Sequence, residues 1–169
     1  MDELSLKTRQ RVFAAMVDLG CQPVINGDGN IEVQFQGEAF IMECFKYYVN
    51  VWDLSWSHVN INDINLPLVK EAMNIANFHN GPAIVMTSPT EEGDRYLHTH
   101  DTWVIHENFV NLEGFLKASL MEFLNLKQEM FMEFNKLKSQ IESQKESDAK
   151  GDATGTDSHS DRLEQPSQN

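Results

Sequence analysis

Residues 31–56 read IEVQFQGEAFIMECFKYYVNVWDLSW, and this stretch decides the fold. From Ile31 to Gln36 apolar and polar side chains alternate, which is the pattern of a strand with one buried face. Gly37 then allows a tight reversal, because glycine adopts positive φ without steric cost. The stretch therefore predicts three consecutive antiparallel strands at the centre of a sheet.

The second and third strands of this stretch carry apolar side chains on both faces. Residues 39–45 place Phe40, Met42 and Cys44 on one face and Ala39, Ile41 and Phe45 on the other. Residues 47–56 place Tyr48, Trp52, Leu54 and Trp56 on one face and Tyr47, Val49 and Val51 on the other. A strand that is apolar on both faces needs cover on both. We therefore expect one face to remain available for self-association or for a partner.

Helices and further strands are predicted on both sides of this stretch. Residues 3–19 show the stripe of an amphipathic helix, and a second helix begins near Asn65 and ends before Gly81. A short apolar strand at 83–87 and a longer strand at 95–106 follow, joined by a polar loop. The pattern predicts an α+β fold with a five-stranded antiparallel sheet and three helices, in the order α-β-β-β-α-β-β-α.

A third helical pattern extends over residues 111–141 and is unusually long. Its apolar residues recur at spacings of three, four or seven: Leu112, Leu116, Leu120, Phe123, Met130, Phe134, Leu137 and Ile141. About 30 helical residues span roughly 45 Å, which is more than a small sheet can cover. We therefore expect the far half to pack against something else, such as another copy of the chain.

The chain divides near residue 141 by composition. Residues 142–169 contain Leu163 as their only large aliphatic side chain. Such a segment cannot bury enough apolar surface to fold. We therefore expect one domain over residues 1–141 and a disordered polar tail over 142–169.

Composition narrows the class of partner and the compartment. The formal net charge of −13 disfavours nucleic acid and anionic membranes as partners, since phosphates repel an acidic surface. The N-terminus lacks the pattern of a secretory signal, and no apolar run reaches the length of a membrane helix. Cys21 and Cys44 match no metal or disulfide spacing, which favours a reducing compartment. We therefore expect a cytoplasmic protein.

One strand raises the possibility of metal chemistry. His98 and His100 lie two residues apart, beside Asp101, and His106 follows. Residues two apart share a strand face, and two imidazoles with a carboxylate can bind zinc or iron. A metal-binding sensor or enzyme that uses His98, His100 and Asp101 is therefore the alternative hypothesis. Nucleophile elbows and glycine-rich phosphate loops are absent from the sequence, so no catalytic residue and no cofactor are predicted.

The order of elements, together with several segments, resembles the YbjN-like family. The resembling segments are DGNIEVQFQGEAFIM, YYVNVWDLSW, LVKEAMNIANFHNG, AIVMTSP and VNLEGFLKASLMEFLNL, spread over residues 6–134. The second helix ends in the pattern Ala76, Asn77, Asn80, Gly81. The resemblance implies a fold like that of type III secretion chaperones, a homodimer, and binding of protein segments without catalytic residues.

The sequence therefore predicts a non-enzymatic protein-binding module, chaperone-like or regulatory, that acts as a homodimer. Its partner is a second copy or a protein or peptide, and not nucleic acid or a membrane. The residues predicted for the partner or dimer surface are Tyr48, Trp52, Trp56, Phe123, Met130, Phe131 and Phe134.

Overall fold

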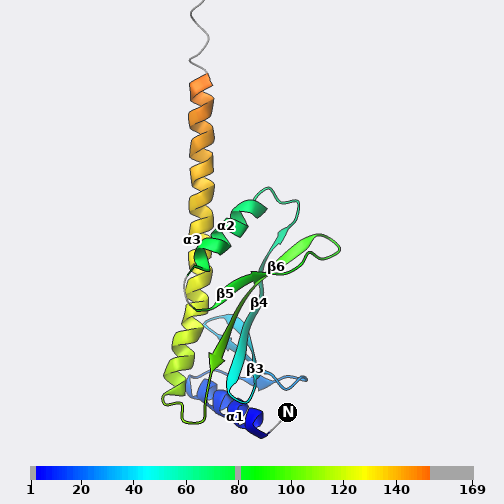
Figure 1. Ribbon diagram of the computed structural model, residues 1–169, viewed down its shortest axis with the longest axis vertical. Helices are drawn as coiled ribbons and strands as arrows, with labels where there is room; N and C mark the ends of the chain where they lie inside the picture. The colour runs from blue at the N-terminus through cyan, green and yellow to red at the C-terminus, as the bar shows by residue number, and fades with distance from the viewer. Residues whose placement is uncertain (1–2, 79–80, 153–169) are drawn as a thin grey trace, which may run out of the picture.

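The computed structural model describes residues 3–78 and 81–152, and it confirms the α+β fold class (Figure 1). The sheet has six strands, one more than predicted, because residues 24–25 pair with the start of the next strand. The elements are α1 (Glu3–Asp18), β1 (Val24–Ile25), β2 (Ile31–Phe35), β3 (Glu38–Cys44), β4 (Tyr48–Asn60), α2 (Leu66–Ala76), β5 (Ala83–Met86), β6 (Asp94–Val104) and α3 (Leu112–Asp152).

The sheet is antiparallel throughout, with the strand order β1-β2-β3-β4-β6-β5. A two-residue turn joins β2 to β3, and Gln36 and Gly37 both have positive φ there. That backbone matches the twist of a tight hairpin and fixes the register with Phe35 opposite Glu38. The hairpin predicted from the sequence at Gly37 is therefore confirmed.

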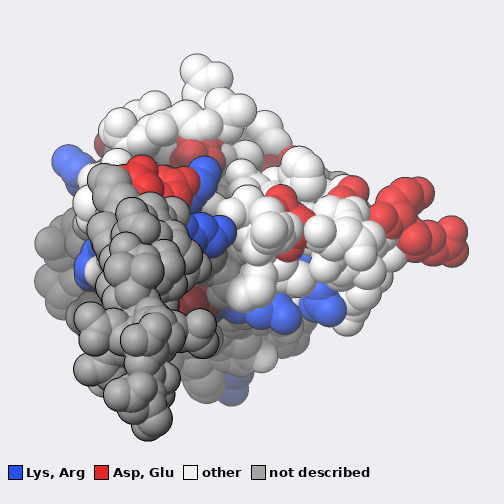
Figure 2. Space-filling model, turned by 90° about the horizontal axis from the view of Figure 1, so that it is seen from above, with Lys and Arg blue, Asp and Glu red and all other residues white. Residues whose placement is uncertain are grey.

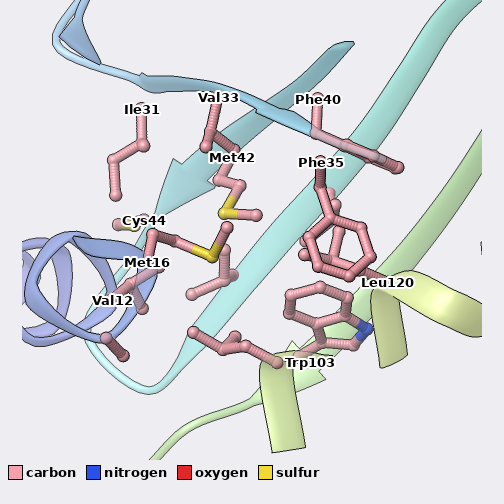
Figure 3. Close-up of a cluster of buried hydrophobic side chains, with 14 of the residues drawn as sticks. Val12, Met16, Ile31, Val33, Phe35, Phe40, Met42, Cys44, Trp103 and Leu120 are labelled. Atoms are coloured by element: carbon pink, nitrogen blue, oxygen red, sulfur yellow. The ribbon is translucent and has the colours of Figure 1, made fainter. Parts of the chain in front are cut away.

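All three helices pack on one face of this sheet and divide the core into two clusters. The first cluster joins α1 and the start of α3 to β2, β3 and β4 (Figure 3). Its members alternate along each strand, as Ile31, Val33 and Phe35 do on β2. The second cluster joins α2 and the middle of α3 to β5 and β6. The opposite face of the sheet has no helix over it in the part of the chain that the structure describes.

The arginines of α1 fasten this helix to neighbouring turns. The guanidinium of Arg9 donates a hydrogen bond of 2.7 Å to the carbonyl of Gly29. The guanidinium of Arg11 donates to the carbonyls of His106 and Phe109. Helical periodicity shows only that these residues lie outside the core stripe, whereas tertiary contact gives them structural partners.

The end of α2 is tied to β5 by one side-chain amide. Asn77 donates to the carbonyl of Ile84 and accepts from the amide N–H of Ile84, both at 2.8 Å. These two bonds satisfy backbone groups that an edge strand would otherwise leave open. Asn77 is one of the four residues in the pattern that ends the second helix, and its role here is structural.

The last helix is longer than the sequence predicts. The helix α3 ends at Asp152, eleven residues beyond the expected end at 141. Residues 142–147 are helical but exposed, so they contribute nothing to the core. Straight-chain residues such as Glu, Gln and Lys favour a helix even without packing, and the hydroxyl of Ser147 bonds the carbonyl of Ser143. The remainder of the predicted tail, residues 153–169, lies outside the described residues.

Candidate functional site

One strip of the uncovered sheet face is built from outward side chains of β4, β5 and β6, and it is bordered on β3 by Glu43, whose carboxylate accepts a hydrogen bond from the amide of Asn50. On β4, Val49, Val51 and Asp53 point to the core and are almost completely buried. Alternation therefore turns the residues between them outward. The outward residues of this strip are Tyr48, Asn50, Trp52, Leu54, Ala83, Val85, His98, His100, Thr102 and Val104. None of these ten is Asp, Glu, Lys or Arg.

Aromatic pairs organise this strip. The rings of Trp52 and His100, paired across β4 and β6, lie 4.0 Å apart. The ring of Tyr48 stacks on that of Phe45, with centroids 4.6 Å apart. Tyr48 and Leu54 are 40% and 45% exposed, and Val104 is 65% exposed. The structure thus places Tyr48 and Trp52, two of the residues predicted for a partner surface, together on one open face.

Trp56 does not lie on this face, contrary to the prediction. The register between β4 and β6 shifts at this point. The pairing advances two residues on β6, from Thr99 to Leu97, while it advances four residues on β4, from Asp53 to Ser57. The resulting bulge contains Ser55 with a φ of +54°. Trp56 turns inside, where its indole N–H donates to Thr99 Oγ1 and its ring packs edge-on against Phe131. Alternation along β4 predicted the wrong face for Trp56 because a bulge changes which residues face inward. The position of the bulge depends on how β4 pairs with the neighbouring strand β6.

The predicted surface on the long helix is also corrected. Phe123 is fully buried and Met130 is 3% exposed, so both are core residues. Phe134 packs against the second cluster, and Phe131 is 47% exposed beside Trp56. The far segment is polar, and Ile141 is the only exposed large apolar residue that the structure places between 138 and 147. Helical periodicity identified the apolar stripe, but the sheet covers it at Phe123, and α2 with β5 and β6 covers it at Met130.

The histidine strand does not form the predicted metal site. His98 and His100 face outward, whereas the carboxylate of Asp101 accepts hydrogen bonds from the indole of Trp103 and the amide of Thr102. Trp103 belongs to the core, so Asp101 faces away from the two histidines. Within residues 3–78 and 81–152, no three His, Cys, Asp or Glu side chains are placed to hold a metal ion.

His98 instead holds the β4 bulge, and this gives a pH-dependent prediction. Its Nδ1 accepts a hydrogen bond of 2.9 Å from the amide of Ser55. Burial lowers the pKa of His98, although the charge of Asp53 opposes this. Because the pKa is lowered in the folded state, the unfolded chain binds the proton more tightly than the folded chain does. The contribution of neutral His98 to stability is therefore present above the ordinary pKa of about 6.5 and is lost as the pH falls below it.

When the pH is lowered from 7.5 to 5.5, we expect the urea concentration at the unfolding midpoint to decrease. The decrease should be smaller in His98→Asn than in the wild type. Asparagine offers an oxygen near the position of Nδ1 but does not titrate. His100→Asn is the matched control and should keep the wild-type pH dependence. An identical pH dependence in wild type and His98→Asn would show that His98 does not contribute.

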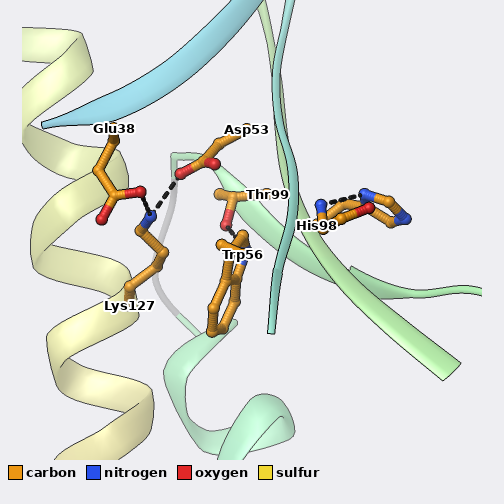
Figure 4. A network of polar contacts seen from close by, with 7 residues as sticks. Glu38, Asp53, Trp56, His98, Thr99 and Lys127 are labelled. Atoms are coloured by element: carbon orange, nitrogen blue, oxygen red, sulfur yellow. Dashed lines mark hydrogen bonds and ion pairs between the residues drawn. The ribbon is translucent and has the colours of Figure 1, made fainter. Parts of the chain in front are cut away.

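A buried ion-pair network that was not predicted from the sequence lies beneath the bulge (Figure 4). Lys127, from α3, contacts the carboxylates of Asp53 and Glu38, the latter at 2.9 Å. The side chains of Lys127 and Asp53 are 7% and 3% exposed. Burial raises the pKa of Asp53, and the hydrogen bond and charge of Lys127 oppose that shift. A cavity of about 270 Å³ opens beside the network, lined in part by Trp56 and Phe131.

Two positions in the sequence indicate this network, because each places a charged residue within an apolar pattern. Asp53 continues the inward series Val49, Val51 on β4, and Lys127 falls between Phe123 and Met130 on the apolar stripe of α3. A charged residue at a core position needs a partner of opposite charge. Reading both positions together would have predicted the pair. Because Lys127 is already paired with two carboxylates, the network anchors α3 to the sheet and offers no free cation to a substrate.

No helix in the described part of the chain combines the length and apolar character needed to cross a membrane. No family model matches this chain. No curated protein sequence matches it either. Among solved structures, the chain is similar to the crystal structure of YbjN, a proposed transcription regulator from E. coli. The two share 10% sequence identity and a TM-score of 0.49, over 78% of this chain and 92% of that chain.

Proposed function

We propose that this chain is a non-enzymatic protein-binding module, chaperone-like or regulatory, that acts as a homodimer. The observation that carries the proposal is the charge-free strip on the uncovered sheet face. Acidic residues outnumber basic ones by 26 to 13 in this chain, and Figure 2 shows separate groups of acidic and basic side chains on the surface seen from above. The centres of protein interfaces are depleted of charge and enriched in aromatic residues. The strip around Trp52 has both properties.

A second copy suits this face because the face is broad and open. Two sheets pack face to face about 10 Å apart when apolar side chains interdigitate between them. A twofold arrangement would place one Trp52 strip on the other, so that two acidic chains meet through their uncharged side chains. A protein or peptide partner that is apolar and uncharged would meet the same surface chemistry.

The proposal includes the absence of catalysis. The polar side chains around the β4 bulge and on β6 already bind other groups of the protein. Lys127 is paired with Asp53 and Glu38. Asp101 accepts two hydrogen bonds, and His98 accepts one from the bulge. A general base or nucleophile needs a group that is available to substrate.

Replacing Trp52 with Asp should convert the homodimer into a monomer. The substitution places a carboxylate at the centre of the strip, and two such charges would oppose each other across a twofold contact. Light scattering after size-exclusion chromatography at micromolar concentration measures the mass directly. Circular dichroism checks that the variant remains folded.

Ile141→Asp tests the alternative dimer surface on the projecting end of α3. Ile141 is 40% exposed there, and the same charge is introduced. The proposal expects Ile141→Asp to remain a dimer. A monomeric wild type would contradict the homodimer, and a dimer lost only in Ile141→Asp would contradict the sheet face.

A further inference from the structure

The bulge of β4 is held from both faces of the sheet. On the open face, Nδ1 of His98 accepts a hydrogen bond of 2.9 Å from the amide of Ser55. On the helix-covered face, the indole N–H of the next residue, Trp56, donates to Thr99 Oγ1 at 3.0 Å. Two consecutive residues of β6 therefore hold two consecutive residues of β4, one pair on each face (Figure 4).

The backbone at Ser55 depends on the bond from His98. Ser55 has a φ of +54°, in the left-handed region that residues other than glycine rarely adopt. The regular pairing of β4 with β6 is interrupted between Asp53 and Ser57, so strand pairing does not hold this residue. A proton on Nδ1 removes the acceptor, because a charged imidazole has two N–H donors. Protonation of His98 therefore takes away a bond that holds a strained backbone.

Trp56 connects the bulge to α3. Its ring packs edge-on against Phe131, with centroids 5.8 Å apart, and the ammonium of Lys127 lies 5.5 Å from the centre of the indole. These three side chains line the cavity of about 270 Å³. A bulge sets the direction of the side chains within it, so a change in the backbone at Ser55 moves the side chain that follows. The path from the open face to α3 thus consists of His98, Ser55 and Trp56.

His98 is the group on this path that titrates near neutral pH. Other titratable side chains lie at nearby positions of β4 and β6: Asp53, His58, Tyr96 and His100. The strand β5, which pairs with the other side of β6, has no titratable side chain. Burial lowers the pKa of His98, and the charge of Asp53, itself paired with Lys127, opposes this shift. The proton therefore binds as the pH falls below the ordinary value of about 6.5.

We propose that the β4 bulge is a proton-sensitive connection between the two faces of the sheet. While His98 is neutral, the bulge holds Trp56 against Thr99 and Phe131. When His98 takes up a proton, its bond to Ser55 is lost, the backbone leaves the left-handed region, and Trp56 moves relative to α3. The protonation state of the open face is thereby transmitted to the helix side. This inference does not depend on the proposed homodimer, because every contact in it lies within one chain.

Two-dimensional NMR of the tryptophan indole N–H groups tests this connection, and Trp56→Phe identifies the Trp56 signal. As the pH is lowered from 7.5 to 5.5, we expect this signal to shift with the same midpoint as the imidazole of His98. The shift should be lost in His98→Asn, whose side-chain oxygen accepts a hydrogen bond but does not titrate. His100→Asn is the matched control and should keep the shift, because His100 lies on the same strand face but packs against Trp52.

Ser55→Gly separates movement of the bulge from a direct effect of the His98 charge on Trp56. Glycine adopts positive φ without steric cost, so this variant should fold and should keep its bulge when His98 is protonated. The pH-dependent shift of the Trp56 signal should therefore be clearly smaller than in the wild type. A shift of wild-type size in Ser55→Gly, a shift that persists in His98→Asn, or a Trp56 signal that does not change with pH in the wild type would overturn the proposal.

Discussion

Lys127→Met should lower the free energy of unfolding by about 3–5 kcal/mol, the usual cost of removing one partner from a buried ion pair. Methionine fills a similar volume, so packing changes little. The cost arises because Asp53 stays buried in the same place without its cation. Its pKa, already raised by burial, loses the opposing contribution of Lys127. Urea or guanidinium unfolding at pH 7 measures the change.

Two further variants make this prediction specific. Lys136→Met removes an exposed lysine of the same helix that pairs with Glu133, and it should change stability by less than about 0.5 kcal/mol. Lys127→Met/Asp53→Leu removes both buried charges and should recover most of the lost stability, since an apolar pair can replace a buried ion pair. A double variant as unstable as Lys127→Met would show that the unpaired carboxylate is not the cause.

Phe123→Ala should also cost about 3–5 kcal/mol, through the cavity that it leaves. Phe123 is fully buried where α3 meets the sheet. Its ring packs edge-on against Phe40, at 5.5 Å, and against Trp103, at 6.2 Å. These neighbours come from two different strands, so the site cannot collapse by moving a single element. Thermal or chemical unfolding gives the difference.

Phe78→Ala is the control for the loss of a phenylalanine ring as such. Phe78 is 88% exposed just after α2, and its removal should change stability by less than about 0.5 kcal/mol. If both alanine variants lost the same stability, burial of Phe123 would not be the source of its effect.

Much of the fold was predictable because it depends on local periodicity. The alternation of Ile31, Val33 and Phe35 placed β2, and the glycine at 37 placed its hairpin. The stripe from Leu116 to Met130 placed α3. The prediction ended α3 too early because it used apolar residues as the criterion, whereas the helix continues to Asp152 and the side chains of residues 142–147 are exposed.

The candidate site was predictable only in part. Tyr48 and Trp52 lie on the open face as their alternation on β4 indicated. Trp56, Phe123 and Met130 do not, for two different reasons. A bulge displaced Trp56, and α2 together with the sheet covered the other two. The metal hypothesis failed because Asp101 alternates to the opposite face from His98 and His100.

The sequence by itself determined the order of the elements, their approximate bounds and the existence of apolar residues on both sheet faces. These follow from side-chain periods of 2 and 3.6 residues, which act within one segment. Tertiary structure alone decided which face the helices cover, where β4 bulges, and that Lys127 meets Asp53, 74 positions away in the sequence. Such contacts depend on how separate segments pack, and no local pattern specifies that packing. The open face of the sheet around Trp52 is defined by both: alternation made it apolar, and the placement of all three helices on the other side left it uncovered.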